Sequence, residues 1–315
     1  MIAARRVLLL LAVCAGPAWA QSPEALDLLR RIHEATHKLS YKGTFIYQHD
    51  GRSETSRITR YSDPRGEISR LEVMDGVPRE IVRTRNEVRC YLPEAKVVKL
   101  DRRPGERGFP ALLPEHVGAL AQHYDITLGE HRRISGFDCQ AVVLTPKDDL
   151  RYGYRFYADA ATGMLLKAVT FDAAGHDVEQ FMFTELALGG VTREMVKPRH
   201  AAAGWRVEDA AAAPAALPGW GLSSELPGFH KVVALRRRLE SKAVGQVVYS
   251  DGLAAVSVFI EPLQGRAAAP TGLARMGAIN IYTREVANHM VTVVGEAPPA
   301  SVQRIADSVE YRRPQ

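Results

Sequence analysis

The stretch 41–61, YKGTFIYQHDGRSETSRITRY, decides the fold of the first two thirds of the chain. Its side chains alternate between two faces of an extended backbone, with Phe45 and Tyr47 on one face. Asp50 and Gly51 then form a strong tight-turn signal, and a second strand is predicted over 54–61. This pattern predicts an antiparallel β-hairpin.

The same alternation continues outward from this hairpin, interrupted at short intervals by turn residues. The connections are too short for crossover helices, so the pattern predicts one antiparallel sheet. A sheet of ten or eleven strands must curl, and its concave face needs covering. Two segments with an apolar helical stripe, 23–39 and 114–124, are predicted to cover it. The first strand of the hairpin is predicted at 41–49. The strands outside the hairpin are predicted at 67–74, 79–85, 87–92, 95–101, 126–134, 137–145, 151–158, 164–171 and 177–188.

The chain begins with an export signal. Basic residues, a short apolar run over 7–15 and the small-x-small triplet Ala18-Trp19-Ala20 predict a signal peptide at 1–20. The apolar run is too short to span a bilayer comfortably. We therefore expect the mature chain, starting at Gln21, to be located in the periplasm.

The rest of the chain divides into three parts. A large β domain is predicted over 21–190. An Ala-, Gly- and Pro-containing segment, 191–217, is typical of a partly flexible linker. A smaller C-terminal α+β domain follows over 218–315, with strands expected at 230–239, 244–250, 253–261, 276–283 and 289–295 and a helix at 301–310 capped by Ser301.

Composition and motifs favour a binding protein over an enzyme. The formal charge of +5 includes Arg5 and Arg6 of the leader, so the mature chain is close to neutral, which does not favour nucleic-acid binding. The sequence has no nucleophile elbow, phosphate-binding loop, dinucleotide fingerprint or zinc-protease motif. We expect no catalytic residues, no metal and no cofactor. Cys90 and Cys139 remain in the mature chain, and pairing and isolated burial are both compatible with the sequence.

A curved sheet packed on helices can leave an apolar cavity that holds a lipid-type ligand. Aromatic residues of the large domain are the candidate lipid-binding residues, although the same side chains would also serve a closed core. These candidates are Phe45, Tyr47, Tyr152, Tyr154 and Phe156.

Short sequence fragments, in order along nearly the whole mature chain, resemble the RseB/MucB family of periplasmic regulators of an envelope-stress sigma factor. The first is the run 73–82, VMDGVPREIV, followed by Asn86-Glu87-Val88. The others are Tyr152-Gly153-Tyr154, Glu179-Gln180-Phe181, Leu226-Pro227-Gly228-Phe229, Tyr249-Ser250-Asp251-Gly252-Leu253 and the run 294–299, VGEAPP.

The resemblance implies both a fold and a function. The large domain should be a half-open barrel around helices, similar to lipoprotein carriers of the LolA/LppX type, beside a smaller α+β domain. The family binds the periplasmic part of a membrane-anchored anti-sigma factor and shields it from proteolysis. Lipid-type signals, such as lipopolysaccharide or a lipoprotein acyl chain, displace it. The resemblance leaves the oligomeric state open, including a homo-oligomer.

The resemblance places the partner on the small domain and the cleft beside it. Aromatic and Arg residues are enriched at the centres of protein interfaces. The candidate partner-binding residues are Trp220, Phe229, Arg236, Arg237, Arg238, Tyr249, Asp251 and Leu253. The three arginines also fit a solvated edge strand, and Asp251-Gly252 fits a hairpin turn in either case. The alternative function is a periplasmic lipid or lipoprotein carrier of the LolA type, which would not need residues 218–315.

Overall fold

A computed structural model describes residues 22–102, 113–114, 116–209, 212–239, 242–263 and 271–313. The predicted signal peptide lies outside the described residues.

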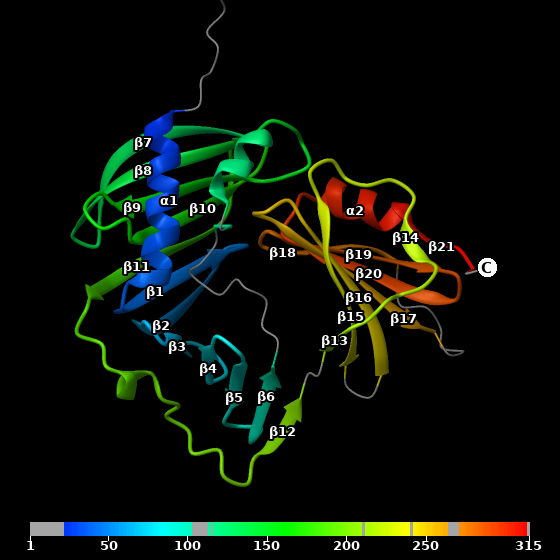
Figure 1. The fold of residues 1–315 in the computed structure, drawn as a ribbon, viewed down its shortest axis with the longest axis horizontal. Helices are drawn as coiled ribbons and strands as arrows, with labels where there is room; N and C mark the ends of the chain where they lie inside the picture. Colours follow the sequence, from blue (N-terminus) through cyan, green and yellow to red (C-terminus); the bar gives the residue numbers. More distant parts are fainter. Residues whose placement is uncertain are drawn as a thin grey trace, which may run out of the picture.

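Twelve strands form the large sheet, in the order β12-β6-β5-β4-β3-β2-β1-β11-β10-β9-β8-β7 (Figure 1). All neighbours are antiparallel except β12 and β6, which are parallel. Because β12 and β7 stand at opposite ends of this order, the sheet is an open half-barrel, which confirms the predicted fold class. The strands are β1 (Tyr41–His49), β2 (Arg52–Asp63), β3 (Gly66–Val73), β4 (Arg79–Thr84), β5 (Val88–Leu92), β6 (Val97–Asp101), β7 (Tyr124–Ile134), β8 (Phe137–Pro146), β9 (Gly153–Asp159), β10 (Leu165–Phe171), β11 (Asp177–Leu188) and β12 (Arg206–Asp209).

The hairpin predicted from 41–61 is β1 and β2, with Tyr47 opposite Glu54. Its turn needs two residues with positive φ, and Asp50 (47°) and Gly51 (71°) provide them. The other edge of β1 pairs with β11, which joins the beginning and the end of the large domain.

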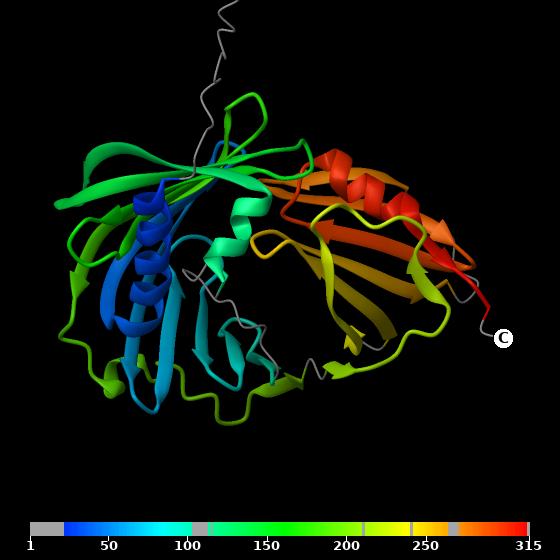
Figure 2. The ribbon, with the colours of Figure 1, turned by 45° about the horizontal axis from the view of Figure 1, so that its top comes forward.

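Two helical segments cover the concave side of this sheet (Figure 2). Helix α1 (Pro23–Lys38) begins at Ser22, whose Oγ accepts a hydrogen bond from the backbone N–H of Ala25 at 3.3 Å. Its buried residues include Leu29 and Ile32, as the apolar stripe predicts. The predicted helix at 114–124 is shorter in the structure, a 3₁₀ helix η1 (Val117–Gln122).

The segment 191–217 runs along the large sheet before it enters the small domain. It contains the 3₁₀ turn η2 (Arg193–Val196), strand β12 beside β6, and strand β13 (Ala212–Pro214). Arg70 Nη1 donates to the carbonyl oxygen of Lys197 at 2.9 Å, and the backbone N–H of Arg199 donates to the Glu80 carboxylate at 3.1 Å. Among the described residues, this segment therefore has hydrogen bonds to both sheets.

The small domain is a sheet in the order β13-β15-β16-β17-β20-β19-β18, with helix α2 packed against β19 and β20. The strand expected at 276–283 is instead a hairpin, since Gly277 has a φ of 59° and turns the chain. The elements are β14 (Trp220–Leu222), β15 (His230–Leu239), β16 (Lys242–Ser250), β17 (Ala255–Pro262), β18 (Gly272–Met276), β19 (Ile279–Val286), β20 (His289–Gly295), α2 (Pro299–Ser308) and β21 (Val309–Tyr311).

Candidate functional site: the domain junction

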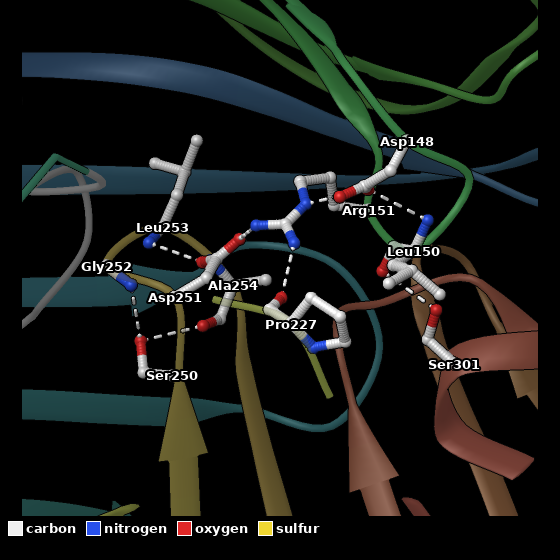
Figure 3. Close-up of polar contacts among 10 residues, drawn as sticks. All are labelled: Asp148, Leu150, Arg151, Pro227, Ser250, Asp251, Gly252, Leu253, Ala254 and Ser301. Atoms are coloured by element: carbon white, nitrogen blue, oxygen red, sulfur yellow. Dashed lines mark hydrogen bonds and ion pairs between the residues drawn. The ribbon is translucent and has the colours of Figure 1, made fainter. Parts of the chain in front are cut away.

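A fully buried arginine lies at the contact between the two domains. Arg151, in the loop between β8 and β9, has a side chain with 0% exposure. Its Nε donates to Asp148 Oδ1 at 2.9 Å within the same loop. Its other two nitrogens reach the small domain: Nη1 donates to Asp251 Oδ2 at 2.9 Å, and Nη2 donates to the carbonyl oxygen of Pro227 at 2.7 Å (Figure 3). A buried guanidinium needs partners of this kind, because removing a charged group from water costs on the order of several kcal/mol.

The two carboxylate oxygens of Asp251 accept hydrogen bonds from different parts of the structure. Oδ1 accepts the backbone N–H groups of Leu253 and Ala254, each at 2.8 Å, and so fixes the turn between β16 and β17. Oδ2 accepts from Arg151, and the Asp251 side chain is also 0% exposed. The predicted turn role of this residue is therefore observed, together with an ion pair across 100 residues of sequence.

A second group of polar contacts also connects the two domains. Asn280 Nδ2 donates to the Tyr152 hydroxyl at 3.0 Å, and Asn280 is completely buried. Ser301 Oγ donates to the carbonyl oxygen of Leu150 at 2.8 Å. This contact corrects the prediction that Ser301 caps the last helix, since the helix begins after Pro298 and Ser301 lies inside it.

The third group of contacts lies at the β1–β2 turn. Glu179 accepts the Tyr47 hydroxyl at 2.6 Å and the backbone N–H of Ala278 at 3.0 Å. Asp50 accepts the backbone N–H of Gly277. We call Arg151, Asp251, Tyr152, Asn280 and Glu179, with their partners, the domain junction.

Four of the predicted partner-binding residues are buried around the junction and in the adjoining cores. Phe229 and Tyr249 are 2% and 8% exposed and belong to the core of the small domain. Leu253 comes from the small domain but packs into the core of the large one. Asp251 and Leu253 therefore connect the two domains, and the contact of all four residues with a partner stays a prediction.

The remaining predicted partner-binding residues lie outside the junction. Trp220 is half-buried, with its ring 5.0 Å from those of His289 and Tyr311. Arg236 is exposed and Arg237 half-buried. The backbone of Arg238 lies in β15, but its side chain is outside the described residues. The prediction that these arginines lie on a solvated edge strand is wrong, because β15 pairs with β13 on one side and with β16 on the other.

The five predicted lipid-binding residues belong to the aromatic core of the large domain or border it. Phe45 and Phe156 are 5% and 0% exposed, and the rings of Tyr154 and Phe156 stack 5.7 Å apart. Burial raises the pKa of the Tyr154 hydroxyl well above its ordinary value. Tyr47 and Tyr152 reach the junction through their hydroxyls, as described above. The lipid-binding role of all five stays a prediction.

His123, which follows η1, is a junction residue that no sequence pattern indicated. An ideal Cβ placed on Gly228 would lie 2.5 Å from Nε2 and Cε1 of this ring, so the ring packs directly on the backbone of the small domain. Burial, and then the nearby Arg151 guanidinium, lower the pKa of His123 below its ordinary value. Neither Arg151 nor His123 belongs to a recognisable motif, because their partners are distant in sequence.

Cys90 and Cys139 are both free, on β5 and β8. Burial raises the pKa of Cys139 to about 11, so its thiol stays protonated at neutral pH. Within the described residues, no three His, Cys, Asp or Glu side chains are grouped to hold a metal ion. The described helices include none long and apolar enough to cross a membrane.

Comparison with known proteins covers both domains. The family model described as MucB/RseB N-terminal domain matches residues 24–203, and that described as MucB/RseB C-terminal domain matches 214–310. The chain is 31% identical to the sigma factor AlgU regulatory protein MucB of Pseudomonas aeruginosa, covering 96% of each chain. It is 24% identical to the sigma-E factor regulatory protein RseB of Escherichia coli, covering 92% of each.

Solved structures give the same result. A crystal structure of MucB in complex with MucA(peri) is 28% identical and superposes with a TM-score of 0.71, covering 92% of this chain and 100% of that one. A complex of Pseudomonas aeruginosa MucA and MucB gives a TM-score of 0.73 at 27% identity over the same share of this chain.

Proposed function

The chain belongs to the MucB/RseB family, and from this premise we propose that it is a periplasmic negative regulator of an envelope-stress sigma factor. It binds the periplasmic segment of a membrane-anchored anti-sigma factor and shields that segment from proteolysis. A lipid-type signal, such as lipopolysaccharide or a lipoprotein acyl chain, releases it.

One observation carries this proposal. The similarity to a MucB that was solved in complex with MucA(peri) extends over 92% of this chain, including the small domain. A lipid or lipoprotein carrier would need only the large domain. Both family models match, so the regulator is favoured over the carrier.

The domain junction supplies a physical route for release. The predicted lipid-binding residue Tyr152 accepts a hydrogen bond directly from Asn280 of the small domain, and Tyr47 donates to Glu179, which also accepts from the backbone N–H of Ala278 of that domain. A ligand that rearranges the aromatic core would therefore disturb the bonds that fix the small domain. Such a ligand shifts the partner equilibrium only if it binds the two domain arrangements with different affinities.

Partner binding is tested by calorimetry with the mature chain 21–315 and the purified periplasmic segment of the anti-sigma factor of the same organism. We expect a stable complex that slows cleavage of the segment by protease. The exposed Arg236 is the sharpest probe on the small domain, and we expect Arg236→Glu to weaken binding at least tenfold. Arg206→Glu, an exposed arginine of β12 that pairs with Glu208, is the matched control and should bind like the wild type. Absence of any complex with the unsubstituted chain contradicts the proposal and favours the carrier.

Release is tested by titrating the preformed complex with a triacylated lipopeptide. We expect partner affinity to fall as the lipopeptide binds, whereas the same peptide without acyl chains leaves it unchanged. Tyr152→Phe removes the hydroxyl bonded to Asn280 and should change the size of the effect. An affinity that does not respond to bound lipopeptide would refute the release step while leaving partner binding intact.

A further inference from the structure

Half of the chain's ten histidines gather around one cavity. The cavity has a volume of about 610 Å³ and lies where α1 and η1 of the large domain meet the small domain. Its small-domain wall includes Gly228 and the turn at Asp251, next to the buried ion pair. The histidines in its lining are His33, His37, His116, His123 and His230.

His123 packs directly against the backbone of the small domain. Its ring lies against Gly228, and Pro227, one residue earlier, accepts a hydrogen bond from Arg151. The charged groups facing His123 come from three elements. They are Arg151 and Asp148 of the β8–β9 loop, Asp251 of the β16–β17 turn and His230 at the start of β15. Lys147, which pairs with Asp125 at 3.6 Å, contacts the end of η1 through a bond to the carbonyl oxygen of Ala121.

The α1 side of the cavity differs in its partners. The rings of His33 and His37 lie 4.7 Å apart. His37 Nδ1 lies 3.5 Å from a Glu67 carboxylate oxygen, and that carboxylate also pairs with Arg60. This contact lies entirely within the large domain. His123, which faces the small domain, lies near the Arg151 guanidinium and His230 as well as the Asp251 and Asp148 carboxylates, and burial together with Arg151 has the larger effect on its pKa.

We propose that this cavity is a proton-sensitive switch of the domain junction, in which protonation of His123 at mildly acidic pH loosens the contact between the two domains. We call the domain arrangement of the structure closed, and one in which the junction contacts are broken open. In the closed arrangement the His123 ring packs on Gly228 and lies near Arg151. A proton on that ring adds a positive charge beside a guanidinium in a partly dehydrated space. Opening the junction hydrates both cations and relieves their repulsion.

The direction of the effect follows from linkage. The pKa of His123 is lowered in the closed arrangement from an ordinary value of 6.5, through burial and the Arg151 charge. The open arrangement therefore binds the proton more readily. The closed arrangement is favoured above pH 6.5, and it loses stability as the pH falls from 6.5 toward the lowered pKa.

The test measures the domain arrangement of the mature chain alone, by small-angle X-ray scattering between pH 7.5 and 5.5. We expect the radius of gyration to increase as the pH falls, with a midpoint below 6.5. His123→Gln, which cannot take a proton, should stay compact over the whole range. His176→Gln is the control, because this histidine is 80% exposed on the β10–β11 turn, and it should respond like the wild type.

His230→Gln is a second variant on an exposed position, for the case that His123→Gln does not fold. Removing one of the two facing imidazoles should reduce the response to pH. A wild type with constant dimensions would overturn the proposal, as would variants that expand as much as the wild type. This measurement needs no partner, so its outcome is independent of the proposed function. Partner affinity that falls over the same pH range would link the two.

Discussion

At the scale of single residues, the junction depends on a few side chains that each meet several groups. Arg151 uses three donor nitrogens on three acceptors, and Asp251 uses one oxygen on its own turn and the other on Arg151. Both side chains are fully buried. Replacing Arg151 would leave the buried Asp251 carboxylate without the cation that pairs with it, and replacing Asp251 would leave Arg151 with Asp148 alone.

Asp251→Asn is predicted to destabilise the chain strongly. The amide oxygen can still accept from the turn, but buried Arg151 loses the fully buried one of its two carboxylate partners and keeps only Asp148, which is 30% exposed. Removing one member of a buried pair costs about 3–5 kcal/mol. Urea unfolding measures this loss. Asp209→Asn is the control, because Arg102, its partner, is 67% exposed, and such pairs contribute roughly 0–1 kcal/mol. Equal losses in the two variants would show that the buried pair has no special role.

Gly228→Ala tests the contact between His123 and the small domain. Gly228 has a φ of 80°, and an added Cβ would lie 2.5 Å from the His123 ring. The left-handed backbone alone costs about 1–2 kcal/mol for alanine, and the collision adds to it. When His123→Ala is combined with Gly228→Ala, we expect the loss of unfolding free energy caused by the collision to disappear and the loss caused by the left-handed backbone to remain. Strictly additive unfolding energies in this double-mutant cycle would mean that the two residues do not touch.

At the scale of elements, the segment 191–217 is held by charges that lie under it. Glu80 and Arg70 are 2% and 7% exposed on the sheet, and both bond to the backbone of residues 197–199. Arg199 adds an ion pair to Glu72 at 2.7 Å. These bonds attach the path between the domains to the large sheet.

Glu80→Gln is predicted to loosen this segment. The amide is a weaker acceptor for the Arg199 backbone N–H, and Arg70 loses a buried carboxylate 3.6 Å away. Trypsin should then cleave after Arg199 several times faster than in the wild type. The rate of this cleavage is measured by mass spectrometry of the digest. Glu54→Gln, whose partner Arg79 is 45% exposed, should leave the cleavage rate unchanged. An unaltered rate in Glu80→Gln would show that the segment is held by other contacts.

At the scale of the whole molecule, the junction connects the two domains through buried contacts. Leu253 crosses into the core of the large domain, and the Arg151 ion pair is sealed by both domains. Unfolding either domain would expose the buried groups of the other.

Calorimetry at pH 7.5 is therefore expected to show one cooperative transition for the wild type. In Asp251→Asn, the weakened junction should let the domains melt separately, giving two transitions. The proposed switch predicts the same separation for the wild type near pH 5.5. Two independent transitions in the wild type at pH 7.5 would mean that the domains are not coupled.

The alternating strands, the hairpin at Asp50-Gly51, the first helix with its Ser22 cap and the family could all be predicted from the sequence. These features depend on residues that are neighbours along the chain, so their patterns are readable without coordinates. The burial of Asp251, Leu253, Phe229 and Tyr249 follows from long-range contacts, as does the grouping of five histidines around one cavity. Arg151 meets Asp251 across 100 residues, and a sequence pattern reports only residues that are close along the chain, so the sequence could not indicate these contacts.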